Sequence, residues 1–113
     1  MHEMALTQSV VEIAIEEARK AGAARVTRIS LDIGRLSAVV PEAMRFCFAA
    51  IAAGTAAEGA ALDIAELDGA GWCLDCGKTV PLNERFGPCP DCAGYKVQMT
   101  GGDEMKIREL EVV

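Results

Sequence analysis

The order of apolar and polar positions at the start of the chain predicts an amphipathic helix and then a strand. Between Met4 and Ala21, apolar residues recur at intervals of three and four, with charged residues between them. Gly22 follows as a residue of the kind that commonly ends a helix. From Arg28 to Ile33 polar and apolar residues alternate, which is the period of a half-buried strand.

A second helix is predicted from Pro41 to Gly54. Proline is favoured in the first turn of a helix, and glycine commonly follows the last one. Four apolar side chains at helical spacing form one face of this segment: Met44, Cys47, Phe48 and Ile51. We expect this helix to be mostly buried, with Cys47 as an unreactive core thiol, because no histidine or cation lies along that face.

Two shorter alternating segments predict further strands, one at Leu62 to Ile64 and one from Met105 to Val112. In the second, the alternation slips at Glu109, and a bulge there would reconcile the two halves. Residues 69–102 lie between these strands, show little periodicity and hold four cysteines. The predicted fold class is therefore α+β: two helices packed on a small three-stranded sheet (residues 1–68 plus 103–113), with an inserted zinc-ribbon-like lobe (69–102).

Charge and composition exclude several classes of function. Eleven lysines and arginines against 17 aspartates and glutamates give a net charge of −6, and the basic residues are scattered, which disfavours nucleic-acid binding. The longest strongly apolar stretch, Phe46 to Ala53, is far shorter than the roughly 18 to 20 residues that span a bilayer. Acidic residues near the N-terminus are unlike a secretory signal, so we expect a cytoplasmic protein without membrane contact.

Four cysteines form two Cys-x2-Cys pairs, Cys73 with Cys76 and Cys89 with Cys92, and twelve residues separate the pairs. Two such knuckles present four thiolates in the tetrahedral arrangement that Zn²⁺ prefers. Two disulfides, a redox pair and an iron centre are the alternatives. Disulfides need an oxidising compartment, a redox motif needs one pair near a βαβ unit, and no feature of the sequence separates iron from zinc. Because four protein ligands close the coordination sphere, we expect the zinc to be structural. Trp72 and Tyr95 are expected to pack against the knuckles.

The first three residues offer a second kind of metal chemistry. The α-amine of Met1, the imidazole of His2 and the amide nitrogens between them can form fused chelate rings, and Glu3 can add an oxygen. Nitrogen-rich tetragonal sites of this kind suit Ni(II) or Cu(II). The alternative is a solvated histidine near a chain end without a ligand role.

The Met1-His2-Glu3 start and the two cysteine pairs, in this order, resemble the HypA/HybF family of hydrogenase maturation nickel chaperones. The similarity spans the whole chain and includes four segments: PEAMRFCF (41–48), WCLDCG (72–77), CPDC (89–92) and TGGDEMKIRELEV (100–112). The resemblance implies a two-helix, three-stranded nickel domain with a zinc lobe inserted before the last strand.

The resemblance also implies a role. His2 would be the key nickel ligand, assisted by Met1 or backbone nitrogens and by Glu3, while the four cysteines hold zinc. The nickel would go to the precursor of the [NiFe]-hydrogenase large subunit, together with a HypB-like maturation GTPase, and in some organisms also to urease maturation proteins. Both a monomer and a homodimer fit the sequence, since the strand after Gly101 and Gly102 can pair within the chain or with a second copy.

Two other classes of function fit the sequence less well. An enzyme lacks a candidate constellation, because Cys47 has no base, His2 is the only histidine and the zinc is fully ligated. The alternative to a metallochaperone is a zinc-ribbon adaptor that binds protein or nucleic acid, in which His2 is incidental. The net charge of −6 disfavours the nucleic-acid version.

Overall fold

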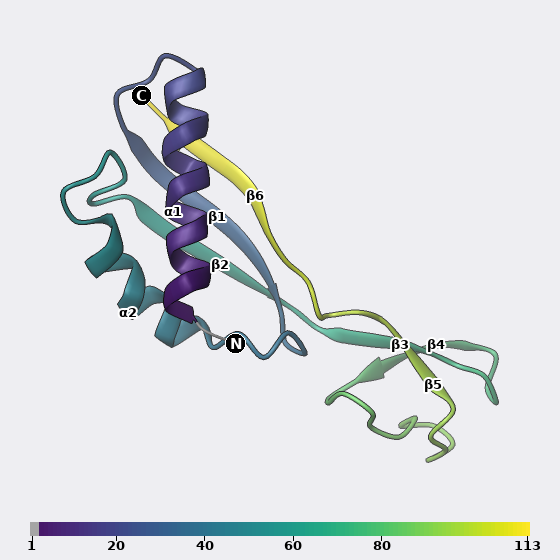
Figure 1. Ribbon diagram of the computed structural model, residues 1–113. Coiled ribbons are helices and arrows are strands. Elements are labelled where there is room, and N and C mark those ends of the chain that lie inside the picture. The colour runs from purple at the N-terminus through teal and green to yellow at the C-terminus, as the bar shows by residue number, and fades with distance from the viewer. Residues whose placement is uncertain (1–2) are drawn as a thin grey trace. The chain divides into compact units, whose positions relative to one another are not determined.

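The computed structural model describes residues 3–113, which form two helices and six strands (Figure 1). In chain order these are α1 (Glu3–Lys20), β1 (Val26–Gly34), α2 (Pro41–Ala52), β2 (Ala61–Leu67), β3 (Gly69–Cys73), β4 (Lys78–Leu82), β5 (Val97–Gly101) and β6 (Met105–Val112). Two of the predicted nickel-binding residues, Met1 and His2, lie outside the described residues. None of the helices within residues 3–113 is long and apolar enough to cross a membrane.

The chain divides into two compact units. The first comprises Met1–Asp32, Val39–Ala65 and Lys106–Val113, and the second comprises Ile33–Ala38 and Glu66–Met105. The short segment 33–38 joins the second unit through backbone hydrogen bonds. In these bonds Gly34, Arg35 and Leu36 donate to the carbonyl oxygens of Glu104, Leu67 and Gly102, at 2.7–2.8 Å.

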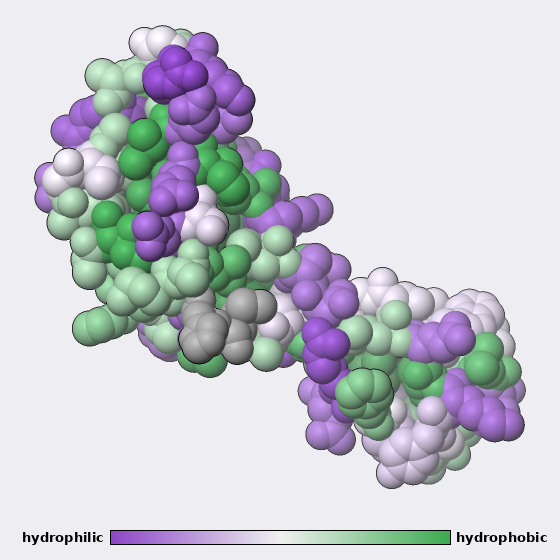
Figure 2. Space-filling view, in the orientation of Figure 1, coloured by the Kyte–Doolittle hydropathy of each residue, from purple (hydrophilic) through white to green (hydrophobic). Residues whose placement is uncertain are grey.

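The first unit packs two helices on a three-stranded sheet, as the sequence predicted (Figure 1). The strand order is β2-β1-β6. The alternating residues Ile29 and Leu31 of β1 are fully buried, and the apolar stripes of both helices are buried with them. From the helices these are Val10, Val11, Ala14, Ala18, Met44, Cys47, Phe48 and Ala52. On the face in Figure 2, hydrophilic residues follow the outer side of α1 and hydrophobic residues flank them. The periodicity of the sequence therefore locates this core.

Charged side chains cover the other face of the same sheet. Arg28 of β1 pairs with Asp63 of β2 and with Glu111 of β6, and Asp32 pairs with Arg108 of β6. Along β6 the exposed positions change from even to odd numbers at Arg108 and Glu109. This is the slip that the sequence predicted at Glu109, and it brings Glu111 to the same face as Arg108.

Helix α2 departs from the prediction that it is mostly buried. Phe46 precedes Cys47 by about 100° around the helix, so that its ring points away from the core and is 81% exposed. The helix therefore buries one face only. Helix α1 begins at Glu3, one residue before the predicted start, so the first three residues do not all precede the helix.

The second unit contains a three-stranded antiparallel sheet of order β4-β3-β5, which the sequence did not predict. Each of its strands has only five residues, and they include three glycines and Pro81, which obscure any alternation. The side chain of Cys73 is buried, whereas its neighbour Trp72 lies on the opposite side of β3 and is 40% exposed. Tyr95 is 74% exposed. The expectation that Trp72 and Tyr95 pack against the cysteine knuckles is therefore wrong.

Candidate metal centre

The first cysteine knuckle is the turn that connects β3 to β4. Cys73 is the last residue of β3, and its carbonyl oxygen accepts a hydrogen bond of 2.8 Å from the amide of Gly77. The amide of Cys76 points at the sulfur of Cys73, at 3.4 Å. Gly77 adopts a positive φ of 65°, which glycine does without a steric penalty. This turn places both sulfurs on one side of the backbone.

The second knuckle repeats this geometry outside any regular element. The amide of Ala93 donates to the carbonyl oxygen of Cys89 at 2.8 Å, as Gly77 does to Cys73. Ala93 also has a positive φ, 61°, although it carries a Cβ atom. The amide of Cys89 donates to the carbonyl oxygen of Gly94 at 2.8 Å and closes the loop. The two knuckles are therefore two copies of one backbone turn, and both present a pair of sulfurs.

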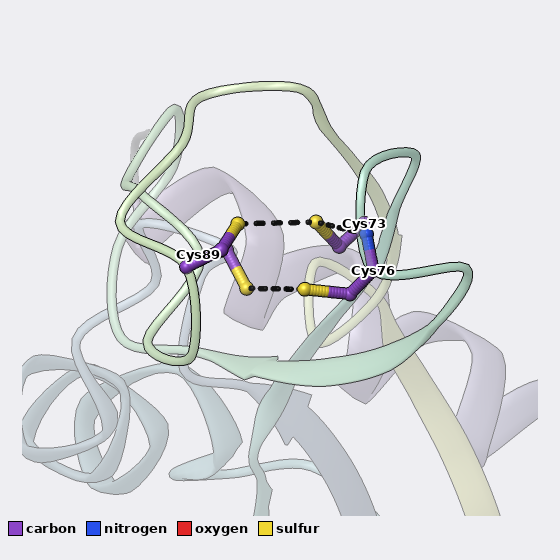
Figure 3. Close-up of side chains that lie close together, drawn as sticks. Cys73, Cys76 and Cys89 are labelled. Atoms are coloured by element: carbon purple, nitrogen blue, oxygen red, sulfur yellow. Dashed lines mark hydrogen bonds between the residues drawn. The ribbon is translucent and has the colours of Figure 1, made fainter.

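The two knuckles face each other, so that the four thiols form one cluster (Figure 3). All four sulfurs lie within 4.8 Å of one another, and the shorter distances between the knuckles are 3.7 Å from Cys73 to Cys92 and 3.9 Å from Cys76 to Cys89. Four sulfurs at about 2.3 Å from one zinc ion form a tetrahedron with edges of about 3.8 Å. The cluster that the sequence predicted is thus already spaced for a four-thiolate metal ion such as zinc.

The surroundings of the four thiols give Cys89 and Cys76 different pKa values. Backbone amides of Cys92 and then Asp91, directed at the sulfur of Cys89, outweigh burial and lower the pKa of Cys89 to about 7. Hydrogen bonding with the thiols of Cys92 and Cys73 raises the pKa of Cys76 to about 12. The metal-free cluster therefore ionises one thiol readily and holds a proton on another, and a metal ion must displace that proton.

Burial also differs among the four cysteines. Cys73 and Cys89 are buried against Val80, with Cys76 and Val97 packed beside them. Cys92 is exposed. The thiol cluster is therefore covered by apolar residues on the side of Cys73 and Cys89 and is open to solvent at Cys92.

An ion pair that the sequence reasoning missed connects the two knuckles. The ammonium of Lys78, two residues after Cys76, lies 2.6 Å from the carboxylate of Asp91, which is inside the second knuckle. The carboxylate of Asp91 raises the pKa of Lys78, first through its hydrogen bond and then through its charge. In the sequence, Lys78 and Asp91 are only a cation near one cysteine pair and an anion within the other, which does not indicate that they meet.

The other candidate residues that the structure describes, Glu3 and Cys47, lie in the first unit. Glu3, the one predicted nickel residue within the described part of the chain, is the first residue of α1. Cys47 is 9% exposed and lies on the buried face of α2, as predicted for a core residue. The structure thus brings together Cys73, Cys76, Cys89 and Cys92.

Known proteins resemble this chain over its full length. The family described as hydrogenase/urease nickel incorporation, metallochaperone, hypA matches residues 1–112. The hydrogenase maturation factor HypA of Rhizobium leguminosarum bv. viciae is 58% identical, with all of both chains covered. HypA 2 of Bradyrhizobium diazoefficiens is 54% identical over 99% of each chain.

The folds agree as well. The solution structure of the Ni metallochaperone HypA from Helicobacter pylori matches 100% of this chain and 98% of its own with a TM-score of 0.70, at 28% identity. A second HypA solution structure gives a TM-score of 0.72 at the same identity, covering 97% of its chain. By sequence over its full length and by fold, this chain belongs to the HypA family of nickel metallochaperones.

Proposed function

We propose that this protein binds Ni(II) at its N-terminus and delivers it to the precursor of the [NiFe]-hydrogenase large subunit, with urease as a second client. The observation that carries the proposal is the family match over residues 1–112, in a chain that begins Met1-His2-Glu3. The imidazole of His2, the amine of Met1 and the amide nitrogens between them supply the nitrogen donors that Ni(II) favours. Glu3 is the third residue of the proposed set and assists these donors.

A metal carrier must bind its ion tightly and still release it to a partner. Donors grouped at a chain end allow release one donor at a time, because each bond breaks without disturbing the core. Binding also requires an unprotonated imidazole, so nickel affinity should fall as the pH drops through about 6.5, the ordinary pKa of histidine. Nickel is cargo in this scheme, and no step requires the chain to act as an enzyme.

The four-cysteine site has a separate task in the proposal. The sulfur spacing suits zinc, and four thiolate ligands leave no position for water or substrate, so the ion is structural. We assign residues 69–102, which lie within the second unit, to this zinc lobe. Residues 1–68 plus 103–113 are assigned to the nickel domain, although 33–38, 66–68 and 103–105 pack with the second unit. A HypB-like maturation GTPase in the cytoplasm is the partner that we propose alongside the hydrogenase precursor.

The test is a metal titration on tag-free protein that retains Met1, compared with His2→Ala and Cys73→Ala variants. We expect one zinc and one nickel per chain, with nickel binding lost in His2→Ala while zinc stays. Cys73→Ala should lose zinc, because three thiolates bind it more weakly and the lobe folds around it. Zinc without nickel, or nickel binding that is indifferent to His2, would instead favour the adaptor function.

A further inference from the structure

The side chain of Glu3 connects the start of α1 to the start of α2. Its carboxylate Oε2 accepts a hydrogen bond of 3.3 Å from the backbone amide of Val40, a residue 37 positions away. Val40 is the residue immediately before α2, and Pro41 is the first residue of the helix. The contact therefore joins the residue next to the proposed nickel donors with the N-terminus of the second helix.

This contact supplies a hydrogen-bond acceptor at the N-terminus of α2. The first amide groups of a helix have no partner within the helix, and Val40 has no side chain that could cap them. A carboxylate acceptor at that position also complements the positive end of the helix dipole. Glu3 lies in the first turn of α1 as well, so its negative charge is stabilised by the N-termini of two helices.

The backbone of Glu3 is held independently of its side chain. The hydroxyl of Thr7, which is 1% exposed, donates a hydrogen bond of 2.6 Å to the carbonyl oxygen of Glu3. Glu3 is thus fixed through its carbonyl to α1 and through its carboxylate to Val40. The chain that leads to His2 leaves from this fixed point.

We propose that Glu3 is a positioning residue whose carboxylate ties the base of the nickel-binding end to Val40, and that this carboxylate is not a nickel ligand. The inference rests on the proposed function, since it concerns the same chain end. A hydrogen-bonding role and a metal-ligand role of the Glu3 side chain can be distinguished by replacing the carboxylate with an amide. An amide oxygen accepts a hydrogen bond from Val40 as a carboxylate oxygen does, but it is a much poorer ligand for a divalent metal ion.

The experiment compares Glu3→Gln with Glu3→Ala in tag-free protein, with Glu12→Ala as a control for the loss of one negative charge on α1. In the metal-free protein, hydrogen exchange of the Val40 amide should be near that of the wild type in Glu3→Gln and faster in Glu3→Ala. Nickel affinity, measured by competition with a metallochromic chelator, should follow the same order. We expect Glu3→Gln within about twofold of the wild type and Glu3→Ala weaker by about 2- to 10-fold, the range of one hydrogen bond.

Two results would overturn the inference. Equal losses of nickel affinity in Glu3→Gln and Glu3→Ala would assign the carboxylate to the metal, and wild-type affinity in Glu3→Ala would leave the contact without a role. A His2→Ala variant measured in parallel tests the proposed function independently of the inference about Glu3. Undiminished nickel binding in His2→Ala contradicts the function, whereas the Val40 exchange data test the contact without any nickel.

Discussion

The carboxylate of Asp32, in the central strand β1, accepts a hydrogen bond from the guanidinium of Arg108 in the neighbouring strand β6. The side chain of Asp32 is only 12% exposed, and the next cation, Lys106, is 4.0 Å away. Removing Arg108 therefore leaves a largely buried carboxylate poorly compensated. The pair of Asp32 and Arg108 differs in this respect from the pair of Arg19 and Glu16 on the surface of α1, whose side chains are 70% and 48% exposed.

We predict that Arg108→Met lowers the free energy of unfolding by about 1 to 3 kcal/mol, the usual cost of an unsatisfied buried polar group. Arg19→Met should change it little, because an exposed pair is already solvated. Urea unfolding followed by circular dichroism measures both variants. Equal effects of the two substitutions would mean that water compensates Asp32 as well as Arg108 does.

Because the two cysteine knuckles share one backbone turn, we expect two matched substitutions to change the rate of zinc release in opposite directions. Gly77 and Ala93 occupy the same position after the second cysteine and share a positive φ, 65° and 61°. A Cβ at Gly77 would meet nothing within 4 Å, so Gly77→Ala costs only backbone strain, about 1 kcal/mol, and Ala93→Gly relieves a similar strain. The rate of zinc release to a chelator should rise in Gly77→Ala and fall in Ala93→Gly. A change of the same sign in both would contradict the equivalence of the turns.

The ion pair between Lys78 and Asp91 predicts a kinetic effect on zinc. Asp91→Asn removes the only ion pair between the knuckles among the described residues. Zinc extraction by a chelator should therefore accelerate by about two- to fivefold, as for a single surface ion pair. Asp75→Asn is the matched control, because Asp75 holds the same place in the first knuckle, between Cys73 and Cys76. If both variants release zinc at the wild-type rate, the ion pair does not hold the knuckles together.

Metal binding to the thiol cluster should release protons. The pKa of Cys76 is raised to about 12, so this thiol is protonated in the metal-free protein at pH 7.5, and Zn²⁺ binds only the thiolate. Thiols are protonated below their pKa, so the apparent zinc affinity should rise with pH between 6 and 8. Calorimetric titrations in two buffers of different ionisation enthalpy measure the released protons. Identical heats in the two buffers would exclude this protonation state.

Local periodicity explains which parts of the fold could be predicted. Helices α1 and α2 and strand β1 carry apolar stripes such as Ile29, Leu31 and Ile33, and each stripe is sufficient to define its element. Strands β3, β4 and β5 are short, and their pairing depends on where the knuckles bring the chain back. The sequence therefore predicted the four cysteines as one site but not the sheet that supports them.

Contacts between distant residues explain what the sequence could not provide. Glu3 and Val40 are 37 positions apart, and nothing in the composition of either segment indicates a hydrogen bond between them. The same holds for Lys78 and Asp91, whose proximity follows from the way the two knuckles face each other. The outward position of Phe46 was missed for another reason: it lies within an apolar run, and only its rotation around α2 places it in solvent.

Trp72 is the only tryptophan of the chain, and it precedes the cluster residue Cys73 on the outer side of β3. Both helices, by contrast, belong to the first unit. Intrinsic fluorescence excited at the indole band thus reports on one unit, while the helical circular dichroism signal reports on the other. The unmodified protein therefore carries two separate optical probes, and the unfolding of either unit can be timed without labels.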